Sequence, residues 1–160
     1  MASFFGIGSP GGGLDIRTVT VRLEAHAAIS KGDVVAVSPL VLTDNEDTIP
    51  HFYKTQTQAT GNASVDDAQF GMFAVALESV ASGAKGLFAL SGIVDAATDG
   101  TADVAVGNGL EADGAANNLN VATTPGRKVI GYALEARADN SVGLIQVMFD
   151  GVNGFGTVES

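Results

Sequence analysis

The chain has 160 residues, of which 46% are hydrophobic and 16% are charged, so it can bury a core and is not disordered throughout. Eight basic against eighteen acidic residues give a formal net charge of −10, which disfavours binding to nucleic acid. The absence of cysteine excludes disulfides, thiolate nucleophiles and cysteine metal sites. No secretory signal or membrane-spanning apolar run is apparent, so we expect no membrane partner.

Residues 1–14 differ from the rest of the chain, because they carry no charged side chain and contain five glycines. Such a segment cannot build a core alone. We predict an extended N-terminal arm that lies across another molecule and is anchored by four apolar side chains, Phe4, Phe5, Ile7 and Leu14. A floppy terminus is the alternative. The stretch GIGSPG (6–11) fits G-x-G-x-x-G, but no strand precedes it and no helix follows, so it does not indicate nucleotide binding.

After the arm, short apolar stretches alternate with glycine-rich turns, a pattern typical of strands. The clearest strand is 16–23, whose alternation places Val19, Val21 and Leu23 on the buried face. Further strands are expected at 29–37, 39–44, 50–57, 71–80, 84–96, 104–112, 117–123, 128–136 and 142–150, and at most one helical turn begins at 64–67. We therefore predict an all-β domain over 15–150, a compact barrel or sandwich of about ten short strands with little helix, followed by a Gly-rich tail at 151–160.

Two stretches of the chain resemble each other, residues 73–92 and 130–149. Ala76-Leu77-Glu78 recurs as Ala133-Leu134-Glu135, and Gly86-Leu87 recurs as Gly143-Leu144, both 57 residues later. Each copy reads as a strand, a polar turn and a return strand, which predicts two similar hairpins in corresponding places of one barrel. A paired acid/base site at Glu78 and Glu135 is the other interpretation, but carboxylates at strand ends are usually solvated. The repeat therefore indicates architecture.

The remaining candidate sites are sparse. His26 and His51 are the only histidines and neither has a second ligand at a metal-like spacing, so both are expected at a surface or interface. No G-x-S-x-G elbow is present. The acidic stretches 43–48 and 95–103 do not match the EF-hand template, which leaves a weak cation site as the alternative to solvated loops. We predict no catalytic, cofactor or metal site, and hence no enzyme.

Three motifs, ISKGDVVAV (29–37), GMFAVALESVASGAKGLFALSGIVDA (71–96) and VIGYALEA with VGLIQVMF (129–136 and 142–149), resemble those of phage capsid decoration (cement) proteins. The resemblance covers residues 28–150, and the chain departs from shorter members by its Phe/Gly-rich start and a longer segment at 44–70. It implies a compact β domain, assembled in host cytoplasm, that binds the major capsid protein on the outer surface of an icosahedral head. It further implies a homotrimer that stabilises the head against internal DNA pressure, with the N-terminal arm binding either capsid or a neighbouring subunit.

A second class of function is a carbohydrate-binding or cell-surface-binding module of a virion spike or fibre. Such modules usually present aromatic side chains for sugar stacking. Here tryptophan is absent, aromatic residues make up 6% of the chain, and Tyr53 and Tyr132 are the only tyrosines. The composition therefore favours the structural interpretation over the carbohydrate-binding one.

Overall fold

The computed structural model describes residues 17–25, 27–40, 51–56, 72–99, 102–113, 117–138 and 142–159, with backbone only at 38–40 and 51–56. These residues form eleven strands: β1 (Val19–Glu24), β2 (Val34–Leu40), β3 (His51–Gln56), β4 (Phe73–Ala76), β5 (Lys85–Thr98), β6 (Gly109–Ala112), β7 (Leu119–Val121), β8 (Lys128–Val129), β9 (Gly131–Ala133), β10 (Gly143–Asp150) and β11 (Gly156–Thr157). They contain no helix, and so none that could cross a membrane. The prediction of an all-β fold is confirmed.

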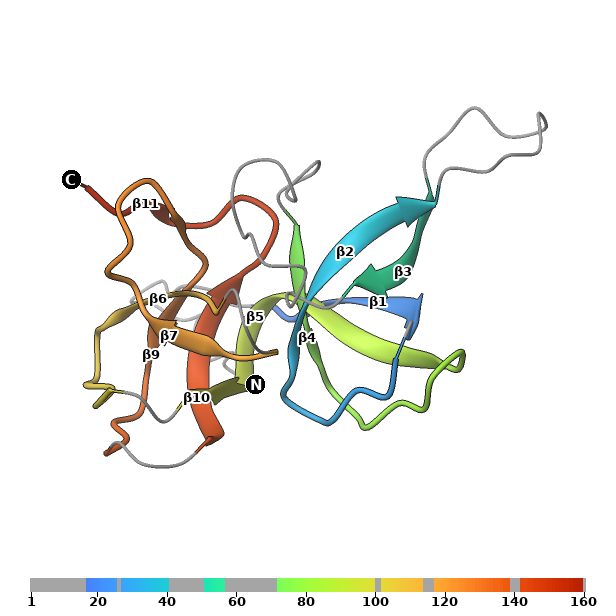
Figure 1. Ribbon diagram of the computed structural model, residues 1–160, viewed down its shortest axis with the longest axis horizontal. Coiled ribbons are helices and arrows are strands. Elements are labelled where there is room, and N and C mark those ends of the chain that lie inside the picture. The colour runs from blue at the N-terminus through green and yellow to red at the C-terminus, as the bar shows by residue number, and fades with distance from the viewer. Residues whose placement is uncertain are drawn as a thin grey trace, which may run out of the picture.

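The strands close two rings that share β5, and Figure 1 shows β5 passing from one lobe to the other. Ring 1 runs β1-β3-β2-β4-β5 and closes through antiparallel pairing of β1 with the first half of β5. Ring 2 runs β5-β10-β9-β6-β7 and closes through one parallel pair, Thr98 with Leu119. A further two-stranded sheet joins β8 to β11. The prediction of a barrel is thus met by a closed five-stranded barrel with a second ring beside it.

Strand β5 changes partners at Gly92. Ser91 pairs with Val19 of β1 and also with Asp150 of β10, so it stands where both rings meet. Gly92 follows with φ of +125°, and a Cβ built there would lie 2.6 Å from the Thr18 Cα. Because an L side chain neither adopts this φ readily nor fits that space, glycine is what allows β5 to turn from one ring into the other.

The two rings repeat the same local structure. Gly32 and Gly107 occupy corresponding tight turns with φ of +89° and +87°. The residue after each glycine accepts a 2.8 Å hydrogen bond from the backbone three residues earlier, through Asp33 in ring 1 and Asn108 in ring 2. The register agrees as well, since Val34 faces Val75 in ring 1 as Gly109 faces Tyr132 in ring 2. The similar stretches 73–92 and 130–149 are therefore corresponding parts of two rings with the same local structure.

This arrangement corrects several details of the sequence interpretation. The two similar hairpins lie in different rings rather than in one barrel. Gly143-Leu144 repeats Gly86-Leu87 in the sequence but does not occupy the same position in the structure. Gln146, two residues after Leu144, takes the place that Leu87 holds in ring 1. Val19 is 51% exposed, since only the later part of β1 reaches the core.

Element boundaries also differ from those expected. The strand expected at 128–136 is divided into β8 and β9 at Ile130, and the expected break before residue 39 is absent because β2 continues to Leu40 with a register irregularity. The tail carries an unexpected strand, β11. Residues 64–67 lie outside the described residues, and the division into arm, domain and tail stays a prediction.

Two clusters of buried side chains fill the rings. The interior of ring 1 holds Leu23, Val35, Ala74, Ala76 and Phe88 with their neighbours. The second cluster fills ring 2 and also takes in outward-facing ring 1 side chains, Val34, Phe73, Val75 and Ala89. Strand β4 is consequently buried on both faces, which explains its unbroken apolar sequence FAVA. The rings pack as one unit because the outer face of ring 1 is covered by ring 2.

Candidate interaction surface

The predicted arm lies outside the described residues, so Phe4, Phe5, Ile7 and Leu14 stay predictions. His26 and the acidic stretch 43–48 lie outside them too, and only the backbone of His51 is described, as part of β3. In the described part of the chain, no three His, Asp or Glu side chains gather where they could hold a metal ion. The sites considered from the sequence are therefore tested only at Glu78, Glu135 and the 95–103 stretch.

Glu78 and Glu135 each accept a hydrogen bond within their own hairpin. The Glu78 Oε1 accepts a 2.9 Å hydrogen bond from the Leu87 backbone N–H, and the Glu135 Oε2 accepts one of 3.0 Å from Gln146. The last backbone hydrogen bond of each hairpin runs from the Leu77 N–H to the Leu87 carbonyl, or from the Leu134 N–H to the Gln146 carbonyl. The glutamate carboxylate adds one more bond, because it accepts from the N–H of that same Leu87 or Gln146. The repeated glutamate thus satisfies a strand-end donor, as the architectural interpretation requires.

The turn at Asp33 links the two rings. Val34 donates a 2.8 Å hydrogen bond to the Asn117 carbonyl, and Asp33 also bonds the Asn117 side chain. Burial raises the pKa of Asp33, and hydrogen bonds from Ser30 and Asn117 oppose that shift only in part. The carboxylate is therefore used to hold the turn rather than to face a substrate.

Ring 2 buries a charged group that sequence reasoning missed. The Glu111 side chain is 2% exposed; its Oε1 accepts a 2.6 Å hydrogen bond from Thr124 and lies 3.7 Å from the Arg127 guanidinium. Its Oε2 and the Asn118 and Asn120 Oδ1 atoms are buried without a hydrogen-bond partner. Arg127 also donates to the Ala112 carbonyl at 3.4 Å. These contacts fasten the 122–127 segment across the outside of β6, which is a structural task.

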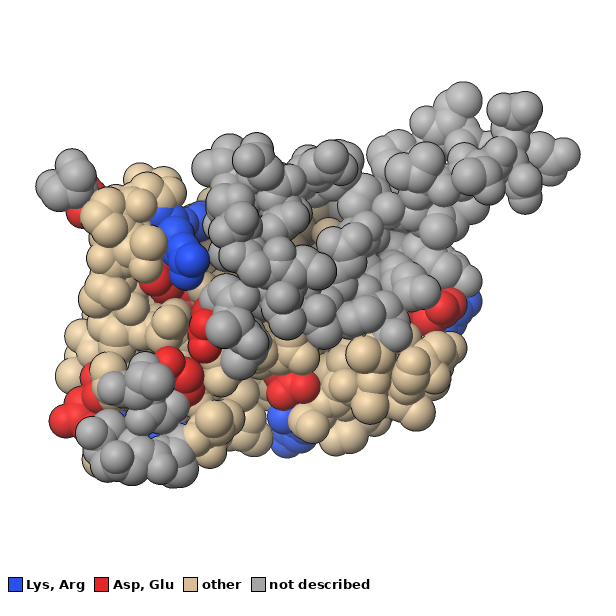
Figure 2. All heavy atoms as spheres, viewed as in Figure 1, with Lys and Arg blue, Asp and Glu red and all other residues tan. Residues whose placement is uncertain are grey.

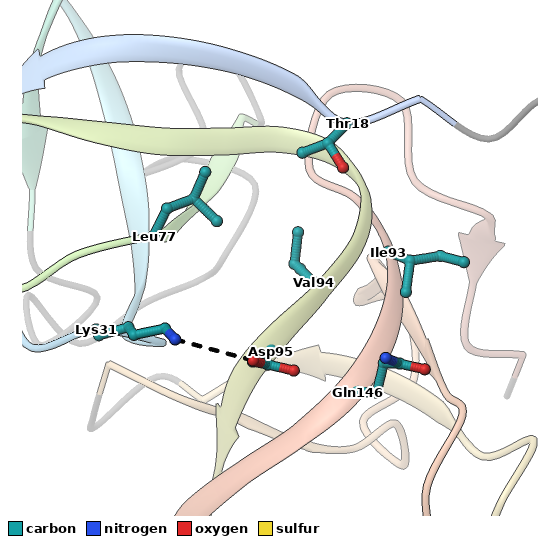
Figure 3. A pocket seen from close by; sticks show the side chains of 7 residues that line it. All are labelled: Thr18, Lys31, Leu77, Ile93, Val94, Asp95 and Gln146. Carbon is teal, nitrogen blue, oxygen red and sulfur yellow. Dashed lines mark ion pairs between the residues drawn. The ribbon is translucent and has the colours of Figure 1, made fainter.

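A hollow of about 330 Å³ lies where the rings meet. Figure 3 shows its lining of Thr18, Lys31, Leu77, Ile93, Val94, Asp95 and Gln146, with the Lys31 ammonium 4.0 Å from the Asp95 carboxylate. Both charged side chains are about half exposed. The lining holds no histidine, serine or second carboxylate, so its chemistry suits contact with an apolar segment better than proton transfer or nucleophilic attack.

The hollow continues onto the outer face of β9 and β10, which we call the β9–β10 face. Register fixes its members: Met148 faces Ile93 on one side and Tyr132 on the other, while Gln146 faces Asp95. The face consists of Ile93, Tyr132, Leu134, Leu144, Gln146 and Met148. Ile93, Leu134 and Leu144 are 38%, 37% and 46% exposed on this one face, and several exposed aliphatic groups on one face indicate an interaction surface.

On the face drawn in Figure 2, acidic and basic side chains occur as small separate groups within uncharged surface. Sequence alone could not find the β9–β10 face, because Leu144, Ile145, Val147 and Met148 are all apolar and only Gln146 marks the outward side. Comparison with known proteins shows which family the chain belongs to.

The family model for phage cement proteins matches residues 15–149, which cover all strands from β1 to β9 and nearly all of β10. The chain belongs to the phage cement protein family. It is accordingly a structural component of a phage virion, as its resemblance to decoration proteins implied. A crystal structure of the head fiber gp8.5 N base in bacteriophage phi29 is similar in fold, with a TM-score of 0.50 and 17% identity over 90% of this chain and 100% of that one. No curated protein sequence matches the chain.

Proposed function

We propose that this phage cement protein is a decoration protein that binds the outer surface of an icosahedral head as a homotrimer. Membership of the cement family over residues 15–149 carries the proposal. The partner is the major capsid protein, and the purpose is to strengthen the shell against internal DNA pressure. No catalytic step is required, which agrees with Glu78 and Glu135 accepting hydrogen bonds within their own hairpins.

The fold suits a load-bearing clamp. Ring 1 and ring 2 share a continuous strand of 14 residues, and outward-facing side chains of ring 1 enter the core of ring 2. A force applied to one ring is therefore transmitted through backbone hydrogen bonds and packed side chains rather than through a flexible linker.

Trimer formation would turn modest contacts into lasting attachment. Linking three footprints raises the effective concentration of the second and third contacts to the order of millimolar, so avidity exceeds single-site affinity by roughly 10²–10⁴. If the footprints lie on different capsid subunits, separating those subunits requires several contacts to break together. Resistance to pressure follows from this geometry.

A head-binding experiment tests the proposal. Purified chain is mixed with expanded heads that lack it, and bound protein is measured by co-sedimentation, together with the temperature at which DNA is released. We expect saturable binding in multiples of three and release at a higher temperature. Binding without any gain in head stability, or no binding, would contradict the decoration role.

The arm is tested by replacing its four apolar side chains with serine at constant length: Phe4→Ser, Phe5→Ser, Ile7→Ser and Leu14→Ser. We expect a folded domain with at least tenfold weaker head binding or trimer formation, because apolar anchors dominate interface energies. The matched control replaces Ser3 and Ser9 with alanine, which leaves the anchors intact. Equal binding by the serine variant and the control would show that the arm is not an anchor.

The carbohydrate-binding alternative finds little support in the described aromatic residues. Tyr132 and Phe155 pack against each other with ring centroids 5.0 Å apart and planes inclined at 60°. Two rings that are tilted together do not offer a flat platform for sugar stacking. Low-micromolar binding on a glycan array would favour this alternative.

A further inference from the structure

The duplicated rings differ in what covers their corresponding outer faces. In ring 1, Val75 and Ala89 point outward and are fully buried, because ring 2 packs on them. Their counterparts in ring 2 are Tyr132 and Met148, since Ala76 pairs with Phe88 as Ala133 pairs with Val147. Tyr132 and Met148 remain partly exposed, and Leu134 beside them is 37% exposed. Among the described residues, Phe155 packs on Tyr132 and the 122–127 segment covers the β6 side of this ring 2 face, while Leu134, Leu144 and Ile93 stay exposed.

None of the six side chains of the β9–β10 face is charged. Two carboxylates lie at its border: Asp95, 4.0 Å from the Lys31 ammonium, and Glu135, which accepts a hydrogen bond from the Gln146 N–H. For a chain of net charge −10, most contacts between copies would bring carboxylates together. This face lets a second copy approach at low electrostatic cost, provided that the approaching segment is itself uncharged.

The chain contains one segment that meets this requirement. Residues 1–14 have no charged side chain and include Phe4, Phe5, Ile7 and Leu14. The segment joins the described domain at Arg17, next to Thr18, which lines the hollow continuous with the face. Sixteen residues can span roughly 50 Å when extended, enough to leave one copy and cross a neighbour.

We propose that the β9–β10 face receives the N-terminal arm of a second copy of this chain. The inference rests on the proposed homotrimer and names the surfaces that build it. A ring of three requires two different complementary surfaces on each subunit, whereas a face that pairs with itself gives a dimer. The arm as donor and the β9–β10 face as acceptor are such a pair, and each copy carries both.

Cross-linking between single-cysteine variants tests the proposal directly, because the native chain has no cysteine. Phe5→Cys is mixed with a mass-tagged Met148→Cys protein and treated with a short bismaleimide. We expect a product that contains one chain of each kind. The control partner is Ser82→Cys, on the exposed turn of ring 1, which should give at least fivefold less product. Equal yields with both partners, or no mixed product, would overturn the proposal.

The double variant Phe5→Cys with Met148→Cys separates exchange between copies from a contact within one chain. We expect it to form linked oligomers. A fast-migrating monomer loop from the double variant, with no mixed product from the single variants, would mean that the arm covers its own face, and would refute the exchange.

A surface substitution supplies an independent measurement. Leu134→Glu places a charge on the face and should raise the dissociation constant of the oligomer at least tenfold, measured by native mass spectrometry and analytical ultracentrifugation. The matched control is Val19→Glu, which adds the same charge at a valine that is 51% exposed and is not a member of the β9–β10 face. An unchanged oligomer in Leu134→Glu overturns the proposal. If circular dichroism shows that this variant is unfolded, the cross-linking yields decide.

These measurements use the purified chain without heads, so they separate the two proposals. Arm exchange without head binding would refute the decoration role and leave this inference standing. Head binding by a protein whose arm does not cross-link to a neighbour would do the reverse.

Discussion

Ring 1 and ring 2 share corresponding strand pairings and turns, and they differ in which elements pack around them. Both use a positive-φ glycine in the turn and a glutamate at the strand end, at Gly32 and Glu78 and again at Gly107 and Glu135. Yet ring 2 packs on the outer face of ring 1, while the same face of ring 2 is covered only in part, by the 122–127 segment and Phe155, and leaves Leu134 37% exposed. The comparison teaches that the backbone requirements are the same in both rings, whereas the outward-facing side chains differ according to what packs against them.

The largest effect should come from the strand that the rings share. Gly92→Val forces a β-branched residue into φ of +125° and against the Thr18 backbone, so we expect a loss of about 3 kcal/mol or more in the free energy of unfolding. Chemical denaturation measures it. Gly83→Ala is the control, with φ of +76° and no atom within 4 Å of the new Cβ, and should cost about 1 kcal/mol. Equal losses would show that the two rings do not depend on this crossing.

A smaller effect is expected where ring 2 buries Glu111 and ring 1 has Ala36 at the matching position of β2. Arg127→Ala leaves the Glu111 carboxylate, 2% exposed, with Thr124 alone, and should cost about 2–4 kcal/mol. The double variant Glu111→Ala with Arg127→Ala makes ring 2 resemble ring 1 and should recover most of that loss. A double variant as unstable as the single one would show that the ion pair itself is what stabilises β6.

The smallest effect concerns the two turns. The folded-state pKa of Asp33 lies above its ordinary value of 3.8, so its contribution to stability is fully present below pH 3.8 and is lost as pH rises through the raised pKa. Asp33→Asn, which copies Asn108, keeps an acceptor for the Ser30 N–H and has no charge to desolvate. We expect it to be more stable than the native chain at pH 7 by less than about 1 kcal/mol, since the site is partly solvated. The gain should vanish near pH 3; a constant difference across this range would contradict the role of ionisation.

Much of the fold was predictable because turn chemistry and apolar alternation are local. The Lys31-Gly32-Asp33 turn, the strands flanking it and the repeated Ala-Leu-Glu all follow from short stretches of sequence. Burial of Val19 was predicted wrongly, because alternation shows which side of a strand a residue faces but not how far the core extends along it. The shared use of β5 could not be foreseen, since a 14-residue strand reads the same whether it has one set of partners or two.

The interaction surface was less accessible to sequence reasoning than the fold. Tyr132, Leu134 and Met148 look like core residues, and in ring 1 their counterparts are indeed more deeply buried. Glu111 likewise gave no sign of burial, because a single glutamate in a short strand is usually solvated. Only register and packing separate these residues from their matched positions.

The sequence by itself determined an all-β, cysteine-free and acidic chain with a repeated hairpin and the motifs of a cement protein, because glycine placement, alternation and charge act through the local chain. The tertiary structure alone decided that the repeat makes two rings around one strand and that the outer face of ring 1 is buried by ring 2 while that of ring 2 stays partly exposed. The physical reason is that burial depends on which distant segment packs against a residue, and identical local patterns can meet different neighbours.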